Sequence, residues 1–245
     1  MVVDGENIFK IIKKDNKDYI SNCVNNNPML LIESMLDLSK KTYGFKKEYS
    51  NIIKEVLLLI VTDICNNEGC KYSDIKLISD YGNYSVVFEI GNKVIKLGNE
   101  RENISFPLNP YIITPLMRRY IEDAINDSKV FVEVEQKVKI DYIPRDKFYD
   151  LYKGIRDLGL IWTDVNCRNV GVLQDDNIIH WKGNLSPNYK ELLFTEKIGD
   201  IILKKGDLVV LDADHIYYEE DDNIALVDDS YYAAFEYQYR LDKKI

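Results

Sequence analysis

The sequence of 245 residues contains little of what zinc sites, secreted proteins and membrane proteins require. It has two histidines and four cysteines, and no two cysteines have the C-x-x-C spacing of a structural zinc site. Unpaired cysteines without an N-terminal signal sequence are typical of a reducing compartment, which predicts a cytoplasmic protein. The longest apolar run, residues 56–61, is too short to cross a bilayer, so we expect no membrane segment.

Positive charge is also scarce relative to negative charge. Lys and Arg number 32 against 41 Asp and Glu, which gives a net charge of -9. This balance argues against a broad surface for nucleic acid or anionic lipid. The hydrophobic fraction of 46% is that of a folded globular protein, and the length suits one large domain or two small lobes.

Residues 1–72 have the apolar period of helices. Asn27-Pro28 begins one segment with apolar residues on a single face, and a second such segment runs from Tyr49 to about Gly69. Amphipathic stripes usually bury themselves in their own fold, so we expect a helical layer on the rest of the protein. Docking of a partner protein or a membrane is the alternative interpretation.

From residue 74 the apolar period changes from helical to alternating. A tight hairpin turn is expected at Gly91-Asn92, because this residue pair is typical of such turns. Together the strands predict a small antiparallel sheet. Five strands are expected, at residues 74–81, 84–90, 93–97, 112–121 and 130–138.

The second half of the chain returns to a helix and then to short strands. A helix is expected over residues 146–158, with Gly159 at its C-terminal cap. Residues 170–173 and 207–212 have the composition of buried strands. The tail is expected to end in a helix at residues 230–241.

An aspartate and an asparagine with fixed spacing lie between that helix and the strand at 170. Asp164 precedes Asn169 by five residues, and the strand at 207–212 ends in Asp212. Spacing alone would suit two turn formers. The helix before the pair, the strand after it and the second strand ending in an aspartate favour a functional site.

This order of motifs resembles the protein-kinase-like superfamily, in which D-x-x-x-x-N and the D-F-G aspartate serve phosphoryl transfer. The resemblance implies that Asp164 accepts the proton of the substrate hydroxyl. It implies that Asn169 and Asp212 hold Mg²⁺ through oxygen ligands. Lys96, at the end of a Val-Ile-Lys strand, would hold the α- and β-phosphates of ATP.

The resemblance also implies further contacts with ATP. The turn before the second strand overlays the family's glycine-rich loop, where Gly82 is retained and Asp80 and Ser85 occupy the other two glycine positions. A loop with fewer glycines should grip phosphate less well. Glu135 and Lys137 fall where the family's hinge offers backbone groups to adenine. The implied contacts of the loop are Gly82, Asn83 and Ser85.

Several positions depart from the family pattern. Trp162-Thr163 replaces the His-Arg before the catalytic aspartate, and Asp214 replaces the glycine of D-F-G. The family's helix with a glutamate partner for the lysine has little room, which leaves Glu100, Glu102 or one of the N-terminal helices to fill that place. Little chain follows Asp212 and it has no A-P-E motif. In this respect the chain resembles the minimal kinases of bacterial pathogens and phages. If the protein is a pathogen effector, the resemblance implies that it acts in the host cytosol.

We therefore expect an α+β, two-lobe protein-kinase-like fold. It would consist of an N-terminal helical extension (1–72), an N-lobe with a five-stranded antiparallel sheet (73–138) and a reduced helical C-lobe (139–245).

The predicted function is that of an ATP- and Mg²⁺-dependent protein kinase, acting on Ser or Thr more than on Tyr. Its expected partners are a protein substrate and a regulatory protein, and not nucleic acid or membrane. One alternative is a small-molecule kinase of the aminoglycoside type, motivated by Asp214. Another is a pseudokinase that acts as a binding module, motivated by the reduced glycine loop. Nucleotidyl transfer from the same pocket is a more distant alternative.

Overall fold

A computed structural model describes residues 22, 24–43, 49–79, 85–98, 111–113, 116–140, 142–176, 203–211 and 215–218. Over these residues the chain has a mixed α+β fold. They divide into two compact units. Unit 1 contains the described residues between 22 and 98 together with residues 116–137. Unit 2 contains residues 111–113 and the described residues from 138 to 218.

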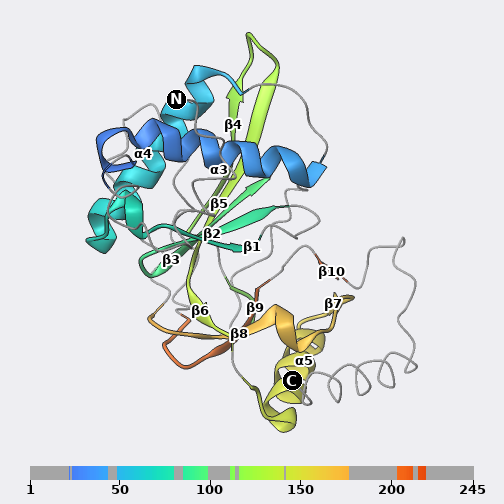
Figure 1. Ribbon diagram of the computed structural model, residues 1–245. Coiled ribbons are helices and arrows are strands. Elements are labelled where there is room, and N and C mark those ends of the chain that lie inside the picture. The colour runs from blue at the N-terminus through green and yellow to red at the C-terminus, as the bar shows by residue number, and fades with distance from the viewer. Residues whose placement is uncertain are drawn as a thin grey trace. The chain divides into compact units, whose positions relative to one another are not determined.

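Unit 1 is built on a five-stranded antiparallel sheet, as the sequence predicts (Figure 1). Its strand order is β1-β2-β3-β5-β4. The two-residue turn between β2 and β3 confirms the expected hairpin, and Gly91 adopts the positive φ of 58° that glycine permits. The strands are β1 (Lys76–Ser79), β2 (Val86–Ile90), β3 (Lys93–Gly98), β4 (Met117–Asp123) and β5 (Ser128–Gln136).

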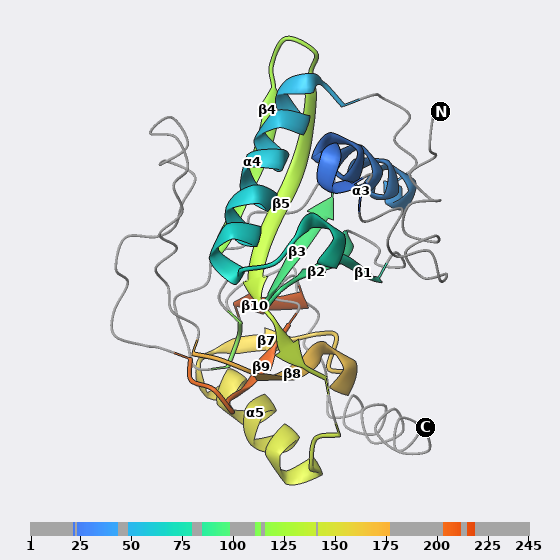
Figure 2. The same cartoon turned by 60° about the vertical axis from the view of Figure 1, so that its left-hand side comes forward.

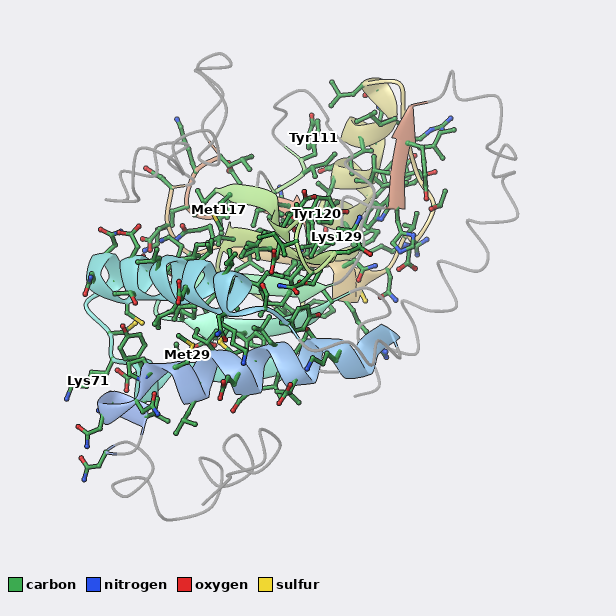
Figure 3. The ribbon with its side chains drawn as sticks, turned by 90° about the horizontal axis from the view of Figure 1, so that it is seen from above. Met29, Lys71, Tyr111, Met117, Tyr120 and Lys129 are labelled. Carbon is green, nitrogen blue, oxygen red and sulfur yellow. The ribbon has the colours of Figure 1, made fainter. Side chains whose placement is uncertain are left out.

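Two helices, α3 (Pro28–Tyr43) and α4 (Asn51–Glu68), cover one face of this sheet (Figures 1 and 2). Alternate strand residues and the apolar stripes of both helices form one core. Met29 of α3 packs against this core and Met117 of β4 belongs to it, so the two side chains mark its two layers in Figure 3. The predicted helical layer is thus confirmed for the described residues, and it shares a core with the sheet.

Helix α4 begins and ends with capping residues that its sequence supplies. The Ser50 side chain accepts a hydrogen bond from the Ile53 amide, and Gly69 adopts φ 64° just after the last turn. The Cys70 amide donates to the Cys65 carbonyl at 3.0 Å, which closes the helix. The expected end of this helix near Gly69 is therefore confirmed.

The opposite face of the sheet is more polar. At the β4–β5 end, Tyr120 meets the edge of Phe131 at a ring-centroid distance of 5.5 Å. The ammonium of Lys129 lies 5.0 Å from the centre of the Tyr120 ring, and Figure 3 shows the two residues together. Further along this face lies Lys96 of β3.

Two expected strand boundaries were wrong. The strand predicted over 112–121 begins at Met117, because Ile112 instead forms a parallel bridge with Val210 in unit 2. The strand predicted over 130–138 ends at Gln136, and Val138 begins a separate strand paired with Leu173. Apolar residues lie on both sides of each break, so composition could not show where the chain leaves the sheet.

Unit 2 combines one described α-helix, α5 (Arg145–Asp157), with short strands. Gly159 has φ 71° and its amide donates to the Arg156 carbonyl, which confirms the predicted cap. The core combines residues of α5 with residues of the strands, among them Phe148, Trp162 and Val210. One small sheet has the order β6 (Val138–Lys139), β8 (Val170–Leu173), β9 (Leu208–Val210), and a second pairs β7 (Leu160–Trp162) with β10 (Ile216–Tyr218).

The prediction for the strand at 170–173 is confirmed, whereas β7 and β10 were not predicted. Within residues 207–212, the strand spans Leu208–Val210. The helix expected at 230–241 lies outside the described residues. In the part of the chain that the structure describes, no helix is long and apolar enough to cross a membrane.

Candidate functional site

Lys96 lies on the face of the sheet opposite to α3 and α4. Its neighbours Ile95 and Leu97 belong to the core of unit 1, and alternation along β3 turns Lys96 to the other face. The residue is nonetheless only 9% exposed. A buried ammonium is costly unless a counter-charge lies beside it.

Two acids of β5 supply this counter-charge. Nζ of Lys96 lies 2.9 Å from Oε1 of Glu135 and 3.2 Å from Oε1 of Glu133. Lys96 and Glu133 are directly opposite each other in the antiparallel register, and Glu135 follows two residues later on the same face. Glu133 is 0% exposed and Glu135 is 4% exposed. We refer to these three residues as the Lys96 cluster.

Glu135 has a strongly shifted proton affinity. Burial is the main reason that the pKa of Glu135 is raised to about 8, while Lys96 acts to lower it and Glu133 to raise it. Near neutral pH Glu135 is therefore largely protonated.

The sequence does not single out Glu133. The resemblance implies that Glu135 offers backbone groups to adenine, and in the structure its side chain accepts a hydrogen bond from Lys96. The expected alternatives for the acidic partner, Glu100 and Glu102, lie outside the described residues. The signal that could have revealed the pair is two glutamates at alternate positions of an otherwise apolar strand, next to Val132 and Val134.

The other predicted nucleotide-binding residues are more dispersed. The Lys137 amide donates to the Asn92 carbonyl at 3.0 Å, and its ammonium lies 2.9 Å from Oε1 of Glu89. An adenine contact through this amide would have to replace the bond to Asn92. Ser85 is buried directly before β2, while Gly82 and Asn83 lie outside the described residues.

In unit 2 the structure brings Asp164 and Asn169 together within one loop. Nδ2 of Asn169 donates to Oδ2 of Asp164 at 2.7 Å and to the Asp164 carbonyl at 3.3 Å. With the amide in this orientation, Oδ1 of Asn169 accepts no hydrogen bond from the described residues. The Asp164 side chain is exposed. A carboxylate and an amide oxygen are thus both available to a ligand.

Local hydrogen bonds fix the shape of this loop. Oδ1 of Asn166 accepts the Arg168 amide at 2.8 Å and begins a 3-10 turn, η2 (Cys167–Asn169), that leads directly into β8. On the other side of Asp164, the Thr163 amide and hydroxyl both donate to the His215 carbonyl, at 2.8 and 3.1 Å. Asp164 therefore lies between two segments that are each held by hydrogen bonds to backbone atoms.

Trp162, two residues before Asp164, is a core residue. It is buried, and its ring stacks on Phe148 with a centroid distance of 5.7 Å. In β7 it pairs with Ile216 of β10. Its contribution is to anchor the loop that follows it.

The backbone also ties Asn169 to β9. The Leu211 amide donates to the Asn169 carbonyl at 2.8 Å, next to the register pair Val170 and Val210. Leu211 is the residue before Asp212, which itself lies outside the described residues.

Asn169 is the described residue that fits the predicted Mg²⁺ site, through its Oδ1 atom. Amide and carboxylate oxygens are the ligands that this ion prefers. Among the described residues, no group of three His, Cys, Asp or Glu side chains could hold a metal ion. The second predicted ligand, Asp212, is outside the part of the chain to which that statement applies.

Comparisons with protein-family models, with curated proteins and with solved structures find no match to this chain.

Proposed function

We propose that this chain has a two-lobe, protein-kinase-like fold, binds ATP and Mg²⁺, and transfers the γ-phosphoryl group to a hydroxyl group of a protein, Ser or Thr more than Tyr. The observation that carries the proposal is the 2.7 Å hydrogen bond from Asn169 to Asp164, in a loop whose backbone is bonded to the residue before Asp212. The sequence pattern for phosphoryl transfer and the contact in space point to the same residues.

In this proposal Asp164 receives the proton of the attacking hydroxyl. Asn169 donates to Oδ2 and so orients the carboxylate, which leaves Oδ1 of Asp164 to accept from the substrate. The exposure of Asp164 suits a group that must meet a large substrate.

Lys96 is assigned to the phosphates of ATP. It lies on the third strand of the sheet, which is where protein kinases carry this lysine. Asn169 and Asp212 would hold Mg²⁺, which when bound neutralises charge on the phosphates. Positioning and electrostatics supply most of the catalysis in this class of reaction, so few side chains are needed.

A pseudokinase is the second candidate. The observations that favour it are the two carboxylates held against Lys96 and the Lys137 amide already bonded to Asn92. If the chain is an active enzyme, the contacts of Lys96 with the two carboxylates and the Lys137–Asn92 hydrogen bond must be compatible with bound nucleotide.

Transfer of label from γ-labelled ATP tests the proposal. The purified chain is incubated with Mg²⁺, labelled ATP and either a mixture of protein substrates or an aminoglycoside. We expect label on protein, reduced by about 10²–10⁴-fold in Asp164→Asn, which is the range for loss of a general base. Asp157→Asn is the matched control, because Asp157 is exposed at the end of α5 and makes the same change outside the loop.

The other outcomes separate the alternatives. Label on the aminoglycoside alone would identify a small-molecule kinase. ATP binding without any transfer would identify a pseudokinase, and an Asp164→Asn variant as active as Asp157→Asn would remove Asp164 from the mechanism.

A further inference from the structure

The Lys96 cluster places charge where a sheet usually has apolar residues. β5 is an inner strand, paired on one side with β3 and on the other with β4. Two buried glutamates on such a strand, together with a buried lysine, cost several kcal/mol per ion in lost hydration. Replacing buried ion pairs with apolar residues is often neutral or stabilising. Stability alone therefore gives no reason for this cluster, which points to a use for a charged lysine at a fixed place.

The cluster fixes Lys96 through the backbone ladder. β3 and β5 pair continuously from Lys93 opposite Gln136 to Gly98 opposite Phe131. Both acids come from one strand, at the position opposite Lys96 and two residues along, so the same ladder positions all three side chains. No loop or helix among the described residues needs to move to bring the acids to the lysine.

We propose that Glu133 and Glu135 together are the acidic partners that position Lys96 for the phosphates of ATP, so that the lysine is fixed within the sheet. This inference rests on the proposed function. The resemblance assigns the same task to a glutamate on a helix, whose movement can switch the site on and off. Here both acids lie on β5, the strand paired with β3, so the sheet itself would hold the lysine in place.

The placement of the two acids determines how they should be tested. Because both contact the Lys96 ammonium, replacing either one with glutamine leaves one carboxyl group beside Lys96. Replacing both leaves none. The single variants Glu133→Gln and Glu135→Gln are therefore close controls for the double variant, and the exposed Glu122→Gln is a control outside the cluster.

The experiment measures the Kd of ATP·Mg²⁺ by titration calorimetry, the KM for ATP, and the Tm without nucleotide, for the full chain and these variants. We expect the double variant to bind ATP·Mg²⁺ at least about tenfold more weakly, since a hydrogen bond to a charged group is lost. KM for ATP should rise more than kcat falls, because the lysine binds ground state and transition state alike. The single variants should stay near wild type.

Four results would overturn the inference. A double variant with a lower Tm and unchanged Kd would make the cluster purely structural. Tighter ATP binding in the double variant would mean that the acids compete with phosphate for Lys96. Both results leave the proposed function standing, whereas a wild-type chain that does not bind ATP·Mg²⁺ removes both. If the double variant does not fold, Glu133→Met/Glu135→Met replaces both acids with apolar residues, and a Kd unchanged in that folded variant would overturn the inference too.

Discussion

At the scale of the residue, the most unusual group is the Glu135 carboxyl. Its pKa is raised from 4.5 to about 8, chiefly by burial, so the folded protein binds a proton there that the unfolded chain releases. The contribution of this group to stability is fully present below about pH 4.5. It is lost as the pH rises toward 8.

The direction of this pH dependence predicts a difference between the wild type and Glu135→Gln. Between about pH 5 and pH 8, the free energy of unfolding of the wild type should fall relative to that of Glu135→Gln, because glutamine cannot titrate. Glu122→Gln should keep the wild-type slope. Urea unfolding at several pH values measures the difference. Parallel curves for wild type and Glu135→Gln would show that Glu135 has an ordinary proton affinity.

The contacts of Asp164 and of Lys96 differ in how far the sequence could predict them. The contact of Asp164 with Asn169 was predictable because both residues lie in one short loop, where five positions of sequence fix the geometry. The contact of Lys96 with Glu133 was not, because it depends on which strands are neighbours. Chain order would place β4 between β3 and β5, whereas the sheet places β5 beside β3.

At the scale of the element, the β2–β3 hairpin depends on α4. Glu68 is the last residue of that helix. Its Oε1 atom lies 2.7 Å from Nζ of Lys93, and its Oε2 atom accepts a hydrogen bond from the Asn92 amide at 2.8 Å. A side chain on Gly91 would place its Cβ 2.6 Å from Cβ of Glu68. The turn that sets the register of Lys96 is thus clamped to the helical layer.

Gly91→Ala should therefore be more destabilising than an ordinary loss of glycine at positive φ. Gly69→Ala is the matched control, since Gly69 has φ 64° and a Cβ added there would meet no atom of another residue within 4 Å. Left-handed strain alone costs about 1 kcal/mol in Gly69→Ala, and the added clash should bring Gly91→Ala to about 2–4 kcal/mol. Urea denaturation of both variants measures this, and equal losses would contradict the clamp.

Some elements could be predicted from local sequence patterns and others could not. The helices α3, α4 and α5 and the hairpin were predictable because their periods and caps are local. The strands β7 and β10 are three residues each and are defined by pairing with each other across a long stretch of chain. Such short segments have too few residues for a period to appear.

At the scale of the whole molecule, the two units have two proposed tasks. Lys96 of unit 1 is assigned to nucleotide binding, and Asp164 of unit 2 to phosphoryl transfer. These tasks are separable in an experiment, because binding and chemistry have different readouts. A variant that keeps the fold is needed in unit 1, where removal of Lys96 alone would leave two buried acids without their counter-charge.

The most direct test compares Asp164→Asn with the triple variant Lys96→Met/Glu133→Gln/Glu135→Gln, which removes the three ionisable groups together. Both the Kd of ATP·Mg²⁺ and the rate of γ-phosphoryl transfer are measured. We predict that the triple variant loses ATP affinity by at least about tenfold, whereas Asp164→Asn binds ATP like the wild type and loses transfer by about 10²–10⁴-fold. Wild-type affinity in the triple variant together with wild-type transfer in Asp164→Asn would contradict both assignments.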